Sequence, residues 1–400
     1  MKSKTESPAE NGGSWMRPIW VILVALAAAI TGAVASGWAA RAALAIEILD
    51  DLRRAGPTSL LERATRPPRM TPLTLAAGGR SFAADLYRPA AGGSRVPVVL
   101  VPGLVEAGKD DPRVAPFARL LARAGFTVVV PDLPSFRTIA VRPANLLELG
   151  LAVDALAARA DLAPDGRAGL FGVSYAGGIA VLSALDPGRA ARVPYVAVAG
   201  SYADLDSALR FLATGRIFEH GHLRRVPPDA YGQLVFLRTF EDFLPRPGDR
   251  ATLEAMAARR IAGPAAPIAD LAPSLGPEAR VIYDLFEGGD PERVPELIAR
   301  LPPELRARMA ALSPARRSLD ALRARLYIVH ARDDGTFPVT DAYRLADLAR
   351  RRTRVRLVVL EALQHVEPRP WRRDLWGLVS RDLPEGARLA AWWVALLGER

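Results

Sequence analysis

The sequence predicts an α/β fold, in which a mostly parallel sheet of eight strands carries helices on both faces. Short, continuous apolar runs such as 96–101 and 195–199 alternate with longer segments of helical periodicity. Runs without polar alternation are typical of strands buried on both faces of a parallel sheet. Half of the 400 residues are apolar, which is enough for a large core.

The chain begins this pattern with two strands, 73–77 and 82–87, around Gly78-Gly79-Arg80, which predicts a hairpin. The other elements expected, in chain order, are strand 96–101, helix 114–124, strand 126–130, helix 144–160, the strand that ends before Ser174 and the helix after it, strand 195–199, strand 325–329, helix 340–350, strand 355–360 and helix 388–397. Because proline pairs break a helical pattern between about 203 and 318, we expect a helical insertion there.

One serine lies among small residues where a predicted strand meets a predicted helix, in Gly172-Val-Ser174-Tyr-Ala176-Gly-Gly178. Residues two before and two after such a serine must be small because their backbones nearly touch. The motif usually reads G-x-S-x-G, and here Ala176 takes the last place. The pattern predicts a nucleophile elbow, with Ser174 as the nucleophile.

A serine hydroxyl needs a base to take its proton and a carboxylate to orient that base. Both residue types follow predicted strands later in the chain, in His330-Ala-Arg-Asp-Asp334-Gly and in Leu360-Glu-Ala-Leu-Gln-His365. The carboxyl ends of parallel strands form the edge where sites occur in open α/β sheets. His365 is the expected base. We expect His330 to pack and hydrogen-bond at its strand end.

With this order of serine, acid and histidine, residues 70–400 resemble the α/β-hydrolase superfamily. The segment from His330 to Pro338 is similar to the family motif H-G-x-x-D-x-x-V-P, and this alignment places the catalytic acid at Asp334. The resemblance implies an oxyanion hole formed by the backbone N–H groups of Leu104 and Tyr175, although Pro102 replaces the usual histidine of that loop. It also implies that the insertion at about 203–318 is a cap, and that no cofactor is needed.

Several alternatives stay open at this stage. Asp333 is a rival for the acid, and related enzymes also place it after the sixth strand, where Asp204 and Asp206 stand. Glu219-His220-Gly221-His222 offers too few ligands for a convincing metal site, so we expect no metal. The same triad serves esterases, thioesterases, acyltransferases, peptidases and lactonases, and a silent binding module is a further possibility. The expected substrate is an ester or thioester of an apolar acid.

The amino terminus predicts a membrane anchor. Residues 18–40 carry no charge and are long enough to span a bilayer, with Trp15, Trp20 and Trp38 near the ends. A cleaved signal peptide is the alternative, since Ala33-Val-Ala35 is a candidate cleavage site. We expect a disordered tail at 1–17, a helix and linker at 41–69, and a single-pass protein of a bacterial inner membrane with its domain outside the cytoplasm.

Composition argues against cysteine chemistry and against a nucleic-acid partner. The chain has no cysteine, so disulfides, thiolate metal sites and a cysteine nucleophile are excluded. The formal charge is +10, but the arginines are scattered among acids and form no basic stripe with aromatics between them. A nucleic-acid surface would show such a stripe, so we expect no nucleic-acid partner.

Overall fold

The computed structural model describes residues 21, 28, 30–32, 37–53, 58–93, 95–263, 266–287, 290–369 and 375–399. The predicted tail at 1–17 lies outside these residues, and so does most of the predicted anchor at 18–40. Within the described part of the chain, no helix combines the length and the apolar character needed to cross a membrane.

The central sheet has eight strands in the order β1-β2-β4-β3-β5-β6-β9-β10. These strands are β1 (Arg69–Ala77), β2 (Arg80–Arg88), β3 (Val98–Val101), β4 (Val128–Pro131), β5 (Gly169–Val173), β6 (Tyr195–Ala199), β9 (Arg325–Ala331) and β10 (Val355–Leu360). Strand β2 pairs antiparallel with β1 and with β4, and every other pairing in the sheet is parallel. The predicted fold class, the mostly parallel eight-stranded sheet of the α/β-hydrolase fold, is confirmed.

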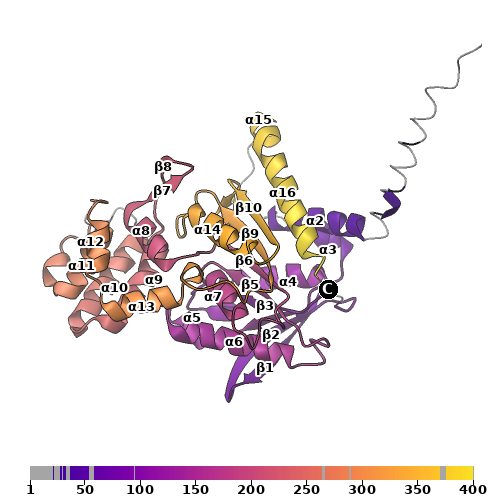
Figure 1. Ribbon diagram of the computed structural model, residues 1–400, viewed down its shortest axis with the longest axis horizontal. Coiled ribbons are helices and arrows are strands. Elements are labelled where there is room, and N and C mark those ends of the chain that lie inside the picture. The colour runs from indigo at the N-terminus through magenta and orange to yellow at the C-terminus, as the bar shows by residue number, and fades with distance from the viewer. Residues whose placement is uncertain are drawn as a thin grey trace, which may run out of the picture.

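Helices precede, connect and follow these strands (Figure 1). They are α2 (Trp38–Arg53), α3 (Leu60–Ala64), α4 (Val114–Arg123), α5 (Pro134–Arg137), α6 (Pro143–Ala157), α7 (Tyr175–Ala184), α8 (Leu205–Thr214), α9 (Ala230–Phe240), α10 (Pro247–Ala262), α11 (Pro277–Glu287), α12 (Val294–Ala299), α13 (Pro303–Ala311), α14 (Val339–Arg350), α15 (Leu375–Gly377) and α16 (Leu383–Leu396). Short turns of helix complete the set, namely η1 (Gly108–Asp110), η2 (Glu241–Phe243), η3 (Ala272–Ser274), η4 (Pro314–Arg316) and the π-type η5 (Leu378–Asp382).

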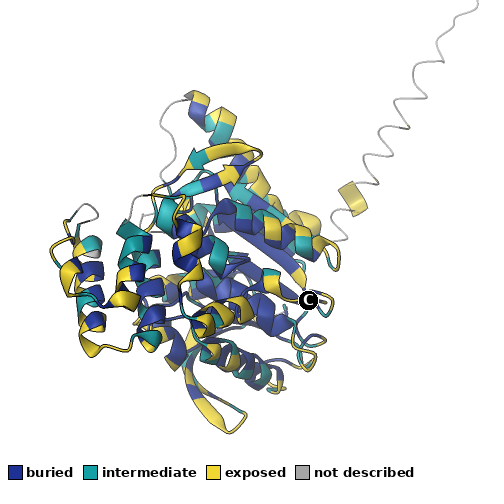
Figure 2. Ribbon diagram, turned by 60° about the vertical axis from the view of Figure 1, so that its left-hand side comes forward, coloured by how far each residue is buried: buried dark blue, intermediate teal, exposed yellow. Residues whose placement is uncertain are grey.

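Each face of the sheet is covered by its own hydrophobic cluster. Successive residues of one strand alternate between them, so that Leu170 of β5 belongs to the cluster with residues of α6, α7 and α14, whereas Phe171 belongs to the cluster with residues of α4, α16 and α2. Figure 2 shows the buried residues concentrated in the sheet and on the inner sides of these helices. This alternation on two buried faces explains why the strands read as continuous apolar runs.

The last helix packs its tryptophans on the sheet. The ring of Trp392 meets Phe171 edge-on at 6.5 Å and Tyr327 at 5.9 Å, and it is almost fully buried. Helix α16 begins at Leu383, five residues before the predicted start at Arg388. The prediction began the helix too late because Pro384 and Gly386 interrupt its apolar pattern, yet Pro384 is in the first turn, where proline is tolerated.

The segment between β6 and β9 contains the helices α8 to α13, which gather at one end of the molecule (Figure 1). It also contains a hairpin that the sequence analysis did not anticipate, formed by β7 (Arg216–Glu219) and β8 (His222–Arg225). His220 and Gly221 form its turn with positive φ angles of 51° and 82°. A two-residue turn of this kind suits the twist of a hairpin, but a histidine at such a φ gives little signal in a sequence.

Before the first strand, α2 packs against α16 (Figure 1), and its Ala45 and Ile48 are fully buried there. A capping box at Ser59 and Glu62 starts α3. Helices α2 and α3 therefore contribute to the same core as the sheet.

Candidate active site

Ser174 occupies a strained turn between β5 and α7. Its φ of 56° and ψ of −130° lie in a region that residues other than glycine rarely enter, which costs about 1–3 kcal/mol. A Cβ on Gly172 would lie 2.6 Å from the carbonyl oxygen of Ala176, so only glycine fits at that position. The sequence motif therefore has its physical cause in the close approach of the two backbone segments.

His365 faces Ser174 from the tip of a small hairpin after β10, formed by β11 (Leu363–Gln364) and β12 (Glu367–Pro368). Its Nε2 lies 3.0 Å from Oγ of Ser174, and its Nδ1 lies 2.7 Å from Oδ2 of Asp334. At the end of β6, a Cβ on Gly200 would come within 3.0 Å of the imidazole Nδ1, so a side chain there would displace the ring. The structure thus brings together the three side chains that the sequence singled out.

Asp334 is completely buried in the loop between β9 and α14. Its Oδ1 accepts hydrogen bonds from the backbone N–H groups of Thr336 (2.8 Å) and Phe337 (3.0 Å), which leaves Oδ2 for His365. Burial opposes the charged form, but the charge and the hydrogen bond of His365 outweigh it and hold the pKa of Asp334 below its usual value. The pKa of His365 is raised in turn, because Asp334 outweighs the effect of burial on the imidazolium.

The rival acids have other partners. Asp333 forms ion pairs with Arg224 and Arg369. Asp204 caps α8 and pairs with Arg316 at 2.8 Å and with Arg344 at 3.0 Å. The third rival, Asp206, pairs with Arg210 along the same helix at 2.7 Å. Of these acids and Asp334, only Asp334 has its carboxylate hydrogen-bonded to His365.

His330 contacts the loop between β9 and α14, which carries Asp334 and is called the acid loop below. It is fully buried at the end of β9, and its Nε2 donates to the carbonyl oxygen of Phe337 at 3.1 Å. Burial lowers its pKa, although the nearby Asp334 acts in the opposite direction. A neutral ring in this position joins the two ends of the loop that carries Asp334.

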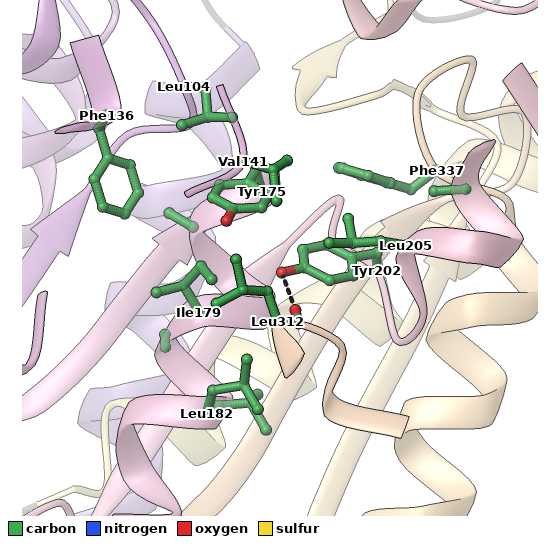
Figure 3. Packing of buried hydrophobic residues seen from close by; sticks show 14 of the residues in the cluster. Leu104, Phe136, Val141, Tyr175, Ile179, Leu182, Tyr202, Leu205, Leu312 and Phe337 are labelled. Carbon is green, nitrogen blue, oxygen red and sulfur yellow. Dashed lines mark hydrogen bonds between the residues drawn. The ribbon is translucent and has the colours of Figure 1, made fainter. Parts of the chain in front are cut away.

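The two residues that the resemblance assigns to an oxyanion hole lie beside Ser174. Leu104 is buried in the loop after β3, where a Cβ on the preceding Gly103 would lie 3.4 Å from the serine hydroxyl. Tyr175 is the first residue of α7, and the first N–H groups of a helix lack partners within it. Figure 3 shows the ring of Tyr175 stacked on Tyr202, with 5.6 Å between the centroids.

Two residues of the segment between β6 and β9 that sequence reasoning missed contact these loops. The hydroxyl of Tyr231 in α9 donates to the carbonyl oxygen of Leu104 at 2.7 Å. Asp229, the N-cap of the same helix, accepts from the hydroxyl of Thr336 at 3.1 Å, and its N–H donates to Gly335. The N-cap pattern could have placed Asp229 at a helix start, but no local signal shows that this helix start lies on the acid loop.

The Glu219-His220-Gly221-His222 segment forms the unanticipated hairpin. The carboxylate of Glu219 is buried against Arg224, Arg332 and the hydroxyl of Tyr343. Over the described part of the chain, no group of three or more histidine and acidic side chains is arranged to hold a metal ion. Two guanidinium groups and one phenol hydroxyl therefore satisfy the carboxylate of Glu219.

A cavity of about 2360 Å³ opens at Ser174 and His365. Most of the side chains along it are apolar, and they come from the segment between β6 and β9, from α4 and from α2 and α16. Ligand sites commonly measure about 300–1,000 Å³ and bury their ligands among apolar side chains. A substrate of considerable size can therefore reach the serine hydroxyl.

No protein-family model matches the sequence, and no curated protein matches it either. Among solved structures, the chain is similar to a hyperthermophilic esterase from the archaeon Pyrobaculum calidifontis, with 15% identity over 90% of both chains and a TM-score of 0.46. A thermophilic carboxylesterase cloned from a metagenomic library has 17% identity over 85% of this chain and 93% of its own, with a TM-score of 0.45. Brefeldin A esterase, a bacterial homologue of human hormone-sensitive lipase, has 15% identity over 90% and 84%, with a TM-score of 0.45. These values are too low to carry an argument about activity.

Proposed function

We propose that this protein is a serine hydrolase that cleaves a carboxylic ester or thioester through an acyl-enzyme intermediate. The observation that carries the proposal is the chain of two hydrogen bonds from Ser174 through His365 to the buried Asp334, with lengths of 3.0 Å and 2.7 Å. Both lengths lie within the reach that proton transfer and base orientation require.

In the proposed reaction, Oγ of Ser174 attacks the acyl carbonyl carbon while Nε2 of His365 takes the hydroxyl proton. Asp334 holds the Nδ1–H and stabilises the imidazolium that forms. The backbone N–H groups of Leu104 and Tyr175 stabilise the oxyanion, and a donor of this kind lowers the barrier by about 3 kcal/mol. The imidazolium then protonates the leaving alcohol or thiol, and water activated by His365 releases the acid from Ser174.

Labelling by a fluorophosphonate probe tests this mechanism directly. We expect the full-length protein to be labelled at Ser174, Ser174→Ala to remain unlabelled, and Ser201→Ala, which alters another buried serine at the same edge of the sheet, to be labelled like the wild type. A well-folded wild-type protein that reacts with no probe would contradict the proposal and favour a silent binding module. Product analysis with an alcohol acceptor would separate hydrolysis from acyl transfer, because a transferase forms a new ester.

We also propose that residues 18–40 anchor the protein in a bacterial inner membrane, with the domain outside the cytoplasm. The uncharged run of suitable length supports this anchor. Membrane fractionation together with mass spectrometry of the amino terminus tests it. Intact protein in the membrane fraction is expected, whereas a mature chain that starts at Ser36 would identify a cleaved signal peptide. Digestion of the domain by protease added to spheroplasts is expected if the domain is outside the cytoplasm.

A further inference from the structure

The side chains around the cavity belong to both core clusters. On the side of the inserted segment, the lining comes from α8 and α9 and includes Leu205, Leu212, Leu234 and Phe236. On the other side, the lining comes from α4, α16 and α2 and includes Phe117, Leu389 and Trp393. We call this second part the α2–α16 branch. The cavity therefore extends from the serine over both faces of the sheet.

Large apolar side chains line the α2–α16 branch in its buried part and at its opening. Leu120 and Trp393 are buried along it, and Leu389 is partly buried. At the opening, Trp38, Ile46 and Leu383 expose 52%, 59% and 51% of their surfaces. Large apolar side chains exposed around the mouth of a cavity mark a surface that contacts apolar ligands or lipid.

Charged side chains also line this part of the cavity, and two of them, Asp382 and Glu385, are buried. Arg41, Asp50 and Arg53 of α2 are further charged residues of the lining. The part beside α4 is instead lined by Phe117, Leu120 and the α16 residue Leu389. A ligand group without hydrogen-bonding atoms suits such an interior, since polar groups buried there would lose their partners.

We infer that the α2–α16 branch binds the long hydrocarbon chain of the acyl group, while the carbonyl carbon lies at Ser174. This inference rests on the proposed function and narrows its substrate class to long-chain, lipid-type esters. Two features favour this occupant over a second protein. The branch is continuous with the cavity at the serine hydroxyl, and its mouth at Trp38 directly follows the apolar run 18–37 in the sequence.

Filling the branch tests the inference in the full-length protein. Ala390 of α16 lines the branch and is partly buried, so Ala390→Trp places a large ring within it. A second variant, Gly386→Trp, adds a side chain at a lining position where a Cβ meets no atom within 4 Å. We therefore expect this variant to fold. The matched control is Ala307→Trp, at an exposed position of α13 outside the cavity lining.

The measurement is kcat/KM for p-nitrophenyl butyrate and p-nitrophenyl palmitate, with fluorophosphonate labelling of each variant. We expect the palmitate-to-butyrate ratio to fall at least tenfold in Ala390→Trp and to fall in Gly386→Trp, while it stays unchanged in Ala307→Trp. Labelling of Ser174 should persist in all three, because a short probe does not reach the branch.

Two outcomes would overturn the inference alone. One is an unchanged ratio in both filled variants while labelling persists. The other is a ratio that changes only when the length of the alcohol is varied in a series of acetates, which would assign the branch to the leaving group. If the folded wild-type protein is not labelled at all, the proposed function itself fails, so the two failures are distinguishable.

Discussion

Two buried carboxylate sites lie at the carboxyl edge of the sheet, and they differ in the partners that face them. In the loop after β9, Asp334 uses one oxygen for backbone N–H groups and the other for the imidazole of His365. At the start of α14, Asp341 uses Oδ2 for the N–H groups of Ala203 and Asp204 at 2.9 Å and 3.1 Å. Both side chains are almost completely inaccessible to solvent.

The charge near each carboxylate explains why the pKa of Asp334 is lowered and that of Asp341 is raised. The imidazole holds the pKa of Asp334 below its usual value despite burial. Burial raises the pKa of Asp341 to about 6, because its backbone donors only partly offset the loss of water and the nearby Asp204 is itself acidic. A buried acid at a strand end is therefore a candidate catalytic residue when an imidazole is its partner, and burial without such a partner does not make it a candidate.

The largest expected effect is that of Asp334→Asn. An amide cannot hold the Nδ1–H tautomer of His365 or stabilise the imidazolium, so kcat should fall by about four orders of magnitude. The measurement is steady-state hydrolysis of an activated ester. The matched control is Asp333→Asn, whose carboxylate pairs with arginines, and it should change kcat less than about threefold. A larger loss in the control than in Asp334→Asn would reverse the assignment of the acid.

The next effect concerns stability at Asp341. Because its native pKa of about 6 exceeds the ordinary value of 3.8, the native state binds the proton more tightly than the unfolded state. The stabilisation of the protonated form is complete below about pH 4 and is lost as the pH rises through 6, on the order of 3 kcal/mol. Asp341→Asn should therefore unfold at a higher temperature than the wild type at pH 8, and the gain should vanish near pH 4.

Calorimetry at the two pH values measures this difference. The amide oxygen can still accept from the N–H groups of Ala203 and Asp204, which is why the variant should fold. If Asp341→Asn melts at a lower temperature than the wild type at pH 8, the ionised carboxylate stabilises the native state there, which would contradict the raised pKa of Asp341.

A smaller loss of stability is expected for Asp204→Ala. This change removes the N-cap of α8, worth about 1 kcal/mol. The same change also removes the ion pairs with Arg316 and Arg344, whose side chains are nearly half-exposed although the carboxylate is buried. Denaturant titration should show the loss, while fluorophosphonate labelling of Ser174 stays at the wild-type level. Lost labelling in a folded variant would instead make Asp204 a participant in the reaction.

The smallest effect tests the electrostatics of the acid loop. Burial lowers the pKa of His365, but Asp334 raises it above 6.5, and Asp229 adds to the rise. Since the base must be neutral, kcat/KM should increase with pH and reach half its maximum above 6.5. Asp229→Asn removes this charge and keeps one oxygen that can cap α9, so it should lower this midpoint. A midpoint that rises would contradict this role for the charge of Asp229.

Much of the fold could be predicted from the sequence because its signals are local. The inner strands β3, β4, β5 and β6 are buried on both faces, so each forms an apolar run, and the elbow requires small residues around Ser174. The hairpin at β7–β8 was missed for the opposite reason. Its strands are short, and Phe218 and Leu223 leave large parts of their side chains exposed.

The candidate site divides in the same way. Ser174 and His365 were indicated by motif and chain order, and Asp334 by resemblance, although Asp333 beside it has the same chemistry. Tyr231 and Asp229 carried no usable signal, because their contacts with Leu104 and Thr336 join positions 127 and 107 residues apart. Such contacts exist only once the inserted helices lie on the loops of the sheet.

The sequence by itself determined the order of strands and helices, the turn that holds Ser174 and the residue types able to pass a proton along. These features depend on periodicity and on the backbone space within a few residues. Only the tertiary structure decided which aspartate faces the imidazole, which one carries a raised pKa and how far the cavity extends between α2 and α16. Those outcomes depend on burial and on charges that distant segments bring together, and no short stretch of the chain determines either the burial or the neighbouring charges.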